Sequence, residues 1–208
     1  MSGHELLDLM KQDELEIAAT YSLPLNDEIS LVPIGNWILT RNQYLQSMAD
    51  WRFHSRENFF ARFPLSVETF SQYLMDHSIG NSSNITFALL DKDETLHGHM
   101  GLSHITANRA TIDAVMIRPE SRGSGLAKLG LEGILNWGND VLGVSAFELE
   151  VLSSNTDAIS LYSHMGFSEI SKSHLRHTTS GSTSFLVECP AEEADAGEFK
   201  LVMCLYFK

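Results

Sequence analysis

A strand-like segment, a glycine-rich turn and a helix follow one another in the middle of the sequence. Residues 111–118 are mostly apolar or β-branched and end at Pro119, which cannot continue a strand. The turn SRGSGLA, residues 121–127, contains two glycines. Beyond it, apolar residues recur every four positions, which is the period of a helix. This order predicts a right-handed crossover to a second, parallel strand, for which 146–152 is the apolar candidate.

The glycine turn has the composition of an anion site. The first N–H groups of a helix have no partner within the helix, and the helix dipole makes that end electropositive. Glycines there allow an anion to approach the backbone closely, and Arg122 adds a permanent positive charge. The turn therefore suits a diphosphate, although it matches neither G-x-x-x-x-G-K-S/T nor G-x-G-x-x-G. A glycine turn that serves only packing is the alternative.

Further predicted elements surround this unit, and together they indicate an α/β (mixed α+β) class. They are a first strand at 29–35, two helices at 40–51 and 66–77, and an antiparallel meander of three strands within 85–118. A further helix at 155–167 and two late strands within 174–207 follow. Thr40 and Ser66 are the predicted caps of the first two helices. We expect a mixed sheet of six or seven strands with about four helices, antiparallel at first and parallel in the middle. We divide the chain into an N-terminal arm, 1–26, which either docks or frays, and a single domain, 27–208.

Composition excludes several classes of function. A formal net charge of −13 repels a nucleic-acid backbone and favours either cationic partners or simple solubility. No apolar run reaches the roughly 20 residues that span a bilayer, and the acidic residues 1–21 do not resemble a secretory signal. We therefore expect no nucleic-acid or membrane partner. Two cysteines, Cys189 and Cys204, form no disulfide framework, which favours a reducing, cytoplasmic location.

Two motifs resemble those of the GCN5-related N-acetyltransferases (GNAT superfamily). The first is R/Q-x-x-G-x-G/A, whose defined positions are Arg122, Gly125 and Ala127. The second is E-V-x-x-x-N-x-x-A-x-x-L-Y-x-x-x-G-F, filled by Glu150, Val151, Asn155, Ala158, Leu161, Tyr162, Gly166 and Phe167. They span residues 113–167 in the family's order.

The resemblance implies a fold, a co-substrate and a reaction. The two parallel strands, 111–118 and 146–152, would splay apart and hold acetyl-CoA between them. Its pantetheine arm would bind like an extra strand, and its diphosphate would bind at the turn. The residues implied in cofactor binding are Val115, Met116, Ile117, Arg122, Gly123, Ser124, Gly125, Leu126, Ala127 and Asn155. An amine would attack the thioester directly in a ternary complex. A catalytically silent acyl-CoA sensor or interaction module is the alternative.

The resemblance also suggests catalytic residues. Tyr162 would protonate the departing sulfur, and its alternative is an ordinary core aromatic. Glu150 would be the base; it shares a strand face with Glu148, and two adjacent carboxylates raise each other's pKa. A solvent-facing or ion-paired role is the alternative, with His99 and His104 as other candidate bases. No third ligand accompanies the H-x-H pair, so no metal is expected.

The acceptor is not fixed by these motifs. The aromatic and arginine-rich segment 50–66 suggests that Trp51, Arg52 and Asn58 line an acceptor pocket, unless its aromatics simply pack in the core. Arginines of this segment, Arg52, Arg56 and Arg62, would suit a sugar-nucleotide phosphate. The negative net charge favours a small-molecule or peptide amine instead. The insertion 176–198 is either an acidic rim or a disordered loop, and a homodimer remains open.

Overall fold

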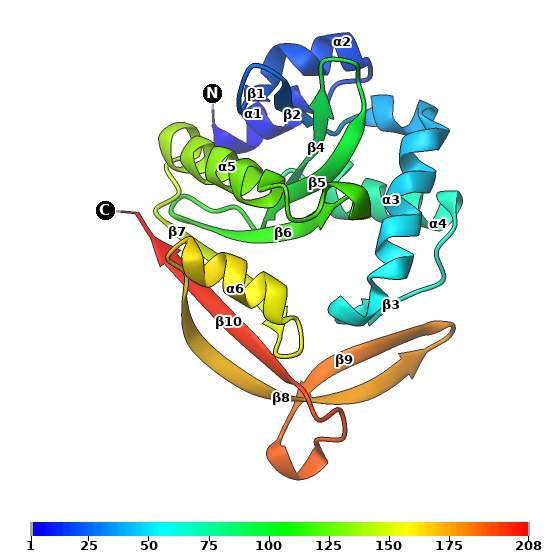
Figure 1. Ribbon diagram of the computed structural model, residues 1–208, viewed down its shortest axis with the longest axis vertical. Helices are drawn as coiled ribbons and strands as arrows, with labels where there is room; N and C mark the ends of the chain where they lie inside the picture. Colours follow the sequence, from blue (N-terminus) through cyan, green and yellow to red (C-terminus); the bar gives the residue numbers. More distant parts are fainter. Residues whose placement is uncertain (1, 208) are drawn as a thin grey trace.

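A single ten-stranded mixed sheet runs through the computed structural model, which describes residues 2–207. The strands are β1 (Leu23–Pro24), β2 (Ile29–Pro33), β3 (Ala61–Arg62), β4 (Ile85–Asp91), β5 (Leu96–Ser103), β6 (Arg109–Ile117), β7 (Ala146–Leu152), β8 (Ser168–Ser180), β9 (Thr183–Cys189) and β10 (Phe199–Tyr206). Their order in the sheet is β1-β2-β4-β5-β6-β7-β10-β8-β9-β3 (Figure 1). The predicted mixed architecture is confirmed, but the predicted six or seven strands were too few. The two-residue strands β1 and β3 are too short to show an alternating pattern.

Six α-helices accompany the sheet. They are α1 (Gly3–Met10), α2 (Leu15–Ala18), α3 (Asn42–His54), α4 (Val67–Leu74), α5 (Leu126–Leu142) and α6 (Thr156–His164). Ser66 caps α4 as predicted, in a capping box with Thr69. Thr40 does not cap α3. It ends a 3-10 turn and donates its hydroxyl hydrogen to the Trp37 carbonyl, so α3 begins one residue later, after Arg41.

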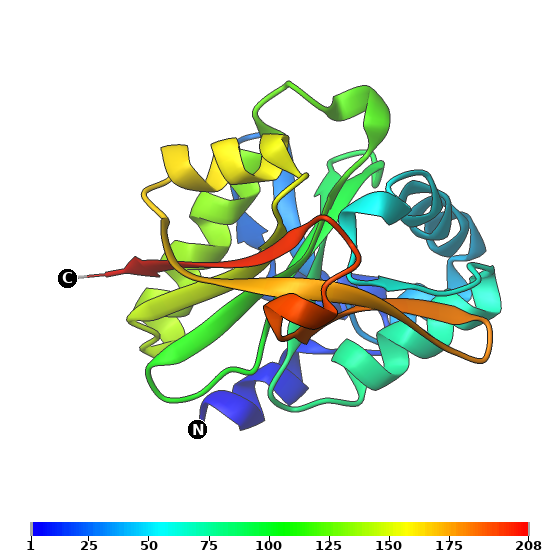
Figure 2. The same cartoon turned by 90° about the horizontal axis from the view of Figure 1, so that it is seen from below.

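The helices cover both faces of the sheet, because each central strand sends alternate side chains to opposite sides (Figures 1 and 2). On β4, Phe87 and Leu89 belong to the core beneath α5, whereas Ala88 and Leu90 belong to the core beneath α3 and α4. Leu7 and Met10 of α1 are almost fully buried in the first core. The N-terminal segment is therefore docked against the core and is not frayed.

The central parallel pair splays apart, as the resemblance implied. Strands β6 and β7 pair only from Arg109–Ala146 to Thr111–Glu148, although both strands continue beyond these positions. The register between β5 and β6 shifts just after this point, and Ala114 has a φ of 53°, which marks a bulge in β6. The bulge bends β6 away from β7. Figure 1 shows the two halves of the sheet diverging toward α3.

A β-hairpin and a short strand bridge the wide end of this divergence. Strand β9 pairs with β8 and also with β3, where the Leu186 N–H donates to the Phe60 carbonyl at 2.8 Å. The segment 59–62, which follows α3, thus pairs with the hairpin at the far edge of the sheet. Much of the region predicted as an acidic insertion, 176–198, is this hairpin. Strand β8 is largely exposed and β9 is mostly half-buried, so neither shows the clear apolar alternation that predicts a strand.

Candidate active site

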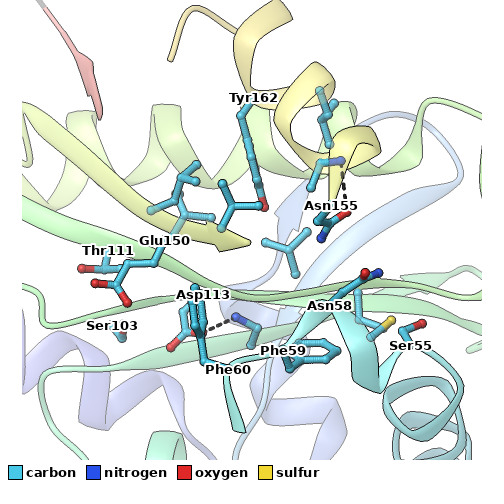
Figure 3. A pocket seen from close by; sticks show the side chains of 18 of the residues that line it. Ser55, Asn58, Phe59, Phe60, Ser103, Thr111, Asp113, Glu150, Asn155 and Tyr162 are labelled. Carbon is cyan, nitrogen blue, oxygen red and sulfur yellow. Dashed lines mark hydrogen bonds between the residues drawn. The ribbon is translucent and has the colours of Figure 1, made fainter. Parts of the chain in front are cut away.

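A cleft of about 470 Å³ lies between the diverging strands. Residues from β6, β7 and α6 form its sides, and the segment 58–60 forms its end toward β3. Figure 3 shows Tyr162 and Asn155 pointing into this space from α6, opposite Asp113 and Phe60. The cleft therefore gathers residues from both predicted motifs.

The glycine turn lies at the edge of the cleft and has the geometry of an anion site. Gly123 and Gly125 have φ values of 76° and 85°, which favour glycine, and no atom lies within 4 Å of a Cβ placed at either position. Gly125 begins α5 without a side-chain cap. Within the described residues, the first N–H groups of α5 have no acceptor, because the first hydrogen bond into the helix is made by Leu129. Unpaired N–H groups at a helix start can bind an anion.

Arg122 connects this turn to the cleft. Its guanidinium donates to the Ser55 hydroxyl at 2.8 Å and to the Ile117 carbonyl at 3.3 Å. Neither partner is an acidic group, and Arg122 forms no salt bridge within residues 2–207. A fixed cation thus stands between the turn and the strand edge.

The predicted pantetheine contacts also line the cleft. Val115, Met116 and Ile117 are lining residues, and this part of β6 pairs with β5 on one edge but not with β7 on the other. Asn155 caps α6 through its side-chain oxygen, which accepts from the Ala158 N–H at 3.4 Å. Its side-chain NH₂ group is not used in that cap. Capping and ligand binding by Asn155 are therefore compatible.

Tyr162 is the buried hydroxyl of the cleft. Only 7% of the residue is exposed, and its hydroxyl has no hydrogen-bond partner among the described residues. Burial raises the pKa of the Tyr162 phenol well above its ordinary value, and the negative charge of Asp113 raises it further. The phenol is therefore protonated at neutral pH and can donate a hydrogen bond to a bound group.

The two predicted acidic residues of β7 do share a face, and each is paired with a cation. Glu150 accepts from Lys200 Nζ at 2.7 Å, and Glu148 accepts from Arg109 at 2.6 Å. Lys200 also pairs with Glu188, and hydrogen bonds to both glutamates outweigh burial and raise the pKa of Lys200. Each of the two carboxylates thus has a cationic partner of its own, so the ion-paired alternative is the one that the structure has.

Asp113 is a third carboxylate in the cleft, and sequence reasoning missed it. It accepts from His77 Nε2 at 2.6 Å and from the Ala114 N–H at 2.6 Å. Although burial opposes ionisation, these bonds and the His77 charge hold the pKa of Asp113 below its usual range. About one third of the Asp113 side chain is exposed. The only signal was an acidic residue inside an otherwise apolar strand.

Some residues of the segment 50–66, predicted to line an acceptor pocket, lie in the core, and others line the cleft. Trp51 is 9% exposed and packs in the core beneath α3, so the packing alternative holds for this residue. Asn58, Phe59 and Phe60 line the end of the cleft. Arg52 lies behind Phe59, next to a second cavity.

The candidate bases His99 and His104 lie in different places. His104 lines the cleft, but His99 is buried among the apolar residues beneath α4, with Phe70 beside it, and neither ring nitrogen has a partner within the described chain. His99 does not line the cleft, which argues against it as the base. The other histidine of the H-x-H pair, His97, does not converge with His99. Its Nε2 donates to the Asp91 carboxylate at 2.9 Å, and its Nδ1 lies 3.3 Å from the Ser121 hydroxyl.

Replacing His99 with methionine should flatten the dependence of stability on pH. Burial, followed by the charge of Arg52, lowers the pKa of His99 to about 4 from an unfolded value of 6.5. The stability that this implies is present above pH 6.5 and is lost as the pH falls toward 4, by about 3 kcal/mol. Urea unfolding of wild type and His99→Met at pH 7 and pH 4.5 measures the difference. Equal losses in both proteins, with exposed His164→Gln as control, would contradict this burial argument.

Comparison with known proteins agrees with the geometry. The family model described as "Acetyltransferase (GNAT) family" matches residues 45–167, more than half of the chain. The N-acetyltransferase 9-like protein of Nematostella vectensis is 26% identical over 170 residues, covering 74% of this chain and 84% of that protein. None of the described helices is long and apolar enough to cross a membrane.

Solved structures share the fold. A spermidine N-acetyltransferase from Vibrio cholerae, in complex with CoA and spermine, has a TM-score of 0.62 at 18% identity over 87% of this chain and 96% of that one. A probable GNAT-family acetyltransferase from Chromobacterium violaceum has a TM-score of 0.68 at 15% identity, over 89% of this chain and 85% of that one. The ribosomal-protein-S18-alanine N-acetyltransferase of Escherichia coli has a TM-score of 0.57 at 20% identity, over 86% of this chain and 93% of that one.

The family match, the splayed strands and the glycine turn point to the same assignment. The match covers both motifs, and the structure places them on either side of one cleft. The resemblance inferred from the sequence is thereby confirmed. The chain belongs to the acetyltransferase (GNAT) family, and with it to the N-acetyltransferase class of enzymes.

Proposed function

We propose that the cleft binds acetyl-CoA and transfers its acetyl group directly to a primary amine. The observation that carries the proposal is that two stretches of backbone beside the cleft do not pair within the described residues. They are the N–H groups that begin α5, at the turn Gly123–Ala127, and the edge of Val115–Ile117 that does not pair with β7. The turn suits a diphosphate, and the strand edge suits the amide groups of a pantetheine arm. The Vibrio cholerae neighbour is described in complex with CoA and spermine, which supports the same co-substrate here.

In the proposed reaction, the acceptor nitrogen bonds to the acetyl carbon, the carbon–sulfur bond breaks and the amine loses a proton. Tyr162 stays protonated because its pKa is raised, so it can stabilise the sulfur by a hydrogen bond as negative charge develops there. Neither cysteine is among the residues lining the cleft. The residue set therefore favours direct transfer over an acyl-cysteine intermediate.

The three carboxylates would have different roles. Glu150 is our candidate base, because it lies at the cleft and is partly open to solvent, so it can pass a proton outward. Asp113 is a poor proton acceptor because its pKa is lowered. Its negative charge would instead attract the ammonium form of the acceptor. Glu148 would be held by Arg109 at the cleft wall.

Release of free thiol from acetyl-CoA in the presence of a panel of primary amines tests the proposal. We expect turnover with at least one amine. Glu150→Gln should lower kcat by about 100-fold, as removal of a general base does. Asp113→Asn should mainly raise the KM for the amine. Glu188→Gln is the matched control, because Glu188 shares Lys200 with Glu150 but does not line the cleft.

The alternative is a silent module that binds acyl-CoA without turnover. Tight binding of acetyl-CoA with no thiol release on any amine would favour it over the enzyme. A Glu150→Gln variant with the kcat of wild type would remove the base assignment but leave the transferase proposal in place. The same assay thus separates the two parts of the proposal.

A further inference from the structure

A second cavity, of about 260 Å³, lies beside the cleft. Its lining comes from the end of α3, the segment around β3 and the tip of the β8–β9 hairpin, and consists of Arg52, Phe53, Arg56, Phe59, Ala61, Arg62, Phe63, Pro64, Leu65 and Ser182. Phe59 also lines the cleft, so one aromatic ring separates the two spaces. We call this second cavity the arginine pocket.

The two spaces differ sharply in charge. Three arginines and no acidic residue line the arginine pocket. Glu57, which does not line it, pairs with Arg56 at 3.4 Å and with Arg62 at 2.9 Å. The cleft, in contrast, is lined by four acidic residues, Asp113, Glu148, Glu150 and Asp157. The positive charge of this cavity is opposite in sign to the net charge of the chain, which is −13.

Arg52 is held in an aromatic cage without an acidic partner. Its guanidinium lies 4.1 Å from the centre of the Phe59 ring, 5.0 Å from that of Phe63 and 5.2 Å from that of Tyr73. Within the described residues, no carboxylate lies within salt-bridge distance of Arg52, and its one hydrogen bond is a long one, 3.4 Å to the Ala61 carbonyl. Burial lowers the pKa of Arg52, but an arginine stays charged at neutral pH. The cage thus positions a cation that still has donors to offer.

A second arginine is incompletely satisfied as well. The Arg62 Nε is buried and has no partner in the described chain, although its other nitrogens contact Glu57. A buried donor without an acceptor is unfavourable unless a ligand or water supplies one. Arg52 and Arg62 both line the pocket, so a carboxylate or phosphate bound there would accept hydrogen bonds from their guanidinium groups.

We propose that the arginine pocket binds an anionic group, a carboxylate or a phosphate, carried by the amine acceptor itself. The acceptor would be bipolar: its amine lies among the acidic residues of the cleft, and its anionic group reaches past Phe59 to Arg52, Arg56 and Arg62. This inference rests on the proposed transferase function. It narrows the acceptor to amines that carry a negatively charged group at some distance from the amine nitrogen.

Matched acceptors test this directly. ω-Amino carboxylic acids with four to eight carbons are compared with their uncharged amides, and peptides with glutamate at positions 2 to 4 are compared with their glutamine versions. We expect kcat/KM to favour at least one charged acceptor over its neutral counterpart by about tenfold in wild type. Arg56→Gln and Arg52→Gln should abolish this preference. The two sets of acceptors distinguish a small molecule from a peptide as the source of the charge.

The control variant is Arg41→Gln, since Arg41 precedes α3 at the end opposite to Arg52 and lines neither space. It should retain the preference. Arg52 also packs against aromatics, so Arg56→Gln alone carries the test if Arg52→Gln fails to fold. Equal kcat/KM for charged and neutral acceptors in wild type, or a preference that survives Arg56→Gln and Arg62→Gln, would overturn the inference.

Binding separates this inference from the proposed function. Calorimetric titration of the CoA-saturated protein with the same acids and amides needs no turnover. Tighter binding of an acid, lost in Arg56→Gln, would support the arginine pocket even if no thiol were released. Thiol release without any preference for charge would leave the transferase in place and remove the pocket's proposed role.

Discussion

Replacing Arg122 with glutamate should weaken acetyl-CoA binding by about 100-fold. The Arg122 guanidinium lies between the glycine turn and the edge of β6, where it contacts only neutral groups of Ser55, Ile117 and Met116. A diphosphate at the turn would gain a charge-assisted hydrogen bond from it, and a glutamate would replace that gain with repulsion. Together these effects cost about 3 kcal/mol.

Isothermal titration calorimetry at two salt concentrations measures this effect. Because the interaction is between charges near the surface, the difference between wild type and variant should shrink as salt increases. Arg41→Glu is the control for the general effect of two added negative charges. An unchanged Kd in Arg122→Glu would show that the diphosphate does not lie at this turn.

Replacing Tyr162 with phenylalanine should lower kcat by about 100-fold while the Kd for acetyl-CoA stays the same. The substitution removes one hydroxyl from a buried ring whose hydroxyl has no partner in the described chain, so the packing against Phe167 is retained. What is lost is the only buried hydroxyl donor that α6 places in the cleft. Loss of one such donor to a developing charge costs about 10²–10³ in rate.

Tyr73→Phe provides the matched control. Tyr73 is also a tyrosine whose pKa is raised by burial, to about 12, but it belongs to α4, stacks on His77 and does not line the cleft. Thermal unfolding of both variants checks that the fold is retained. A kcat within twofold of wild type in Tyr162→Phe would return Tyr162 to the role of an ordinary core aromatic.

The middle of the fold was readable from the sequence because its signals are local. The meander β4–β6 has short turns, α5 has a clear period, and Gly166 ends the segment after α6 with a φ of 95°. The bridge across the wide end of the sheet was not readable. It depends on a two-residue strand, β3, whose residues pair with Phe185 and Ser184, which lie 124 and 122 positions later in the chain. Nothing local specifies such a pairing.

The candidate site also has one part that the sequence predicted and another that it did not. The turn at 122–127 and Tyr162 belong to motifs of fixed spacing, so the sequence predicted them. The Asp113–His77 pair joins residues 36 positions apart across a bulge, and the cage around Arg52 requires Phe59, Phe63 and Tyr73 to fold back onto α3. Such contacts arise from tertiary packing, which sequence spacing does not encode.

The most direct test of the central claim is a crystal structure of the protein with acetyl-CoA. Our account predicts the diphosphate within hydrogen-bond distance of the N–H groups of Gly123–Ala127 and the thioester between β6 and β7, near Tyr162. A co-substrate bound elsewhere on the molecule, or one whose diphosphate leaves this turn empty, would contradict it.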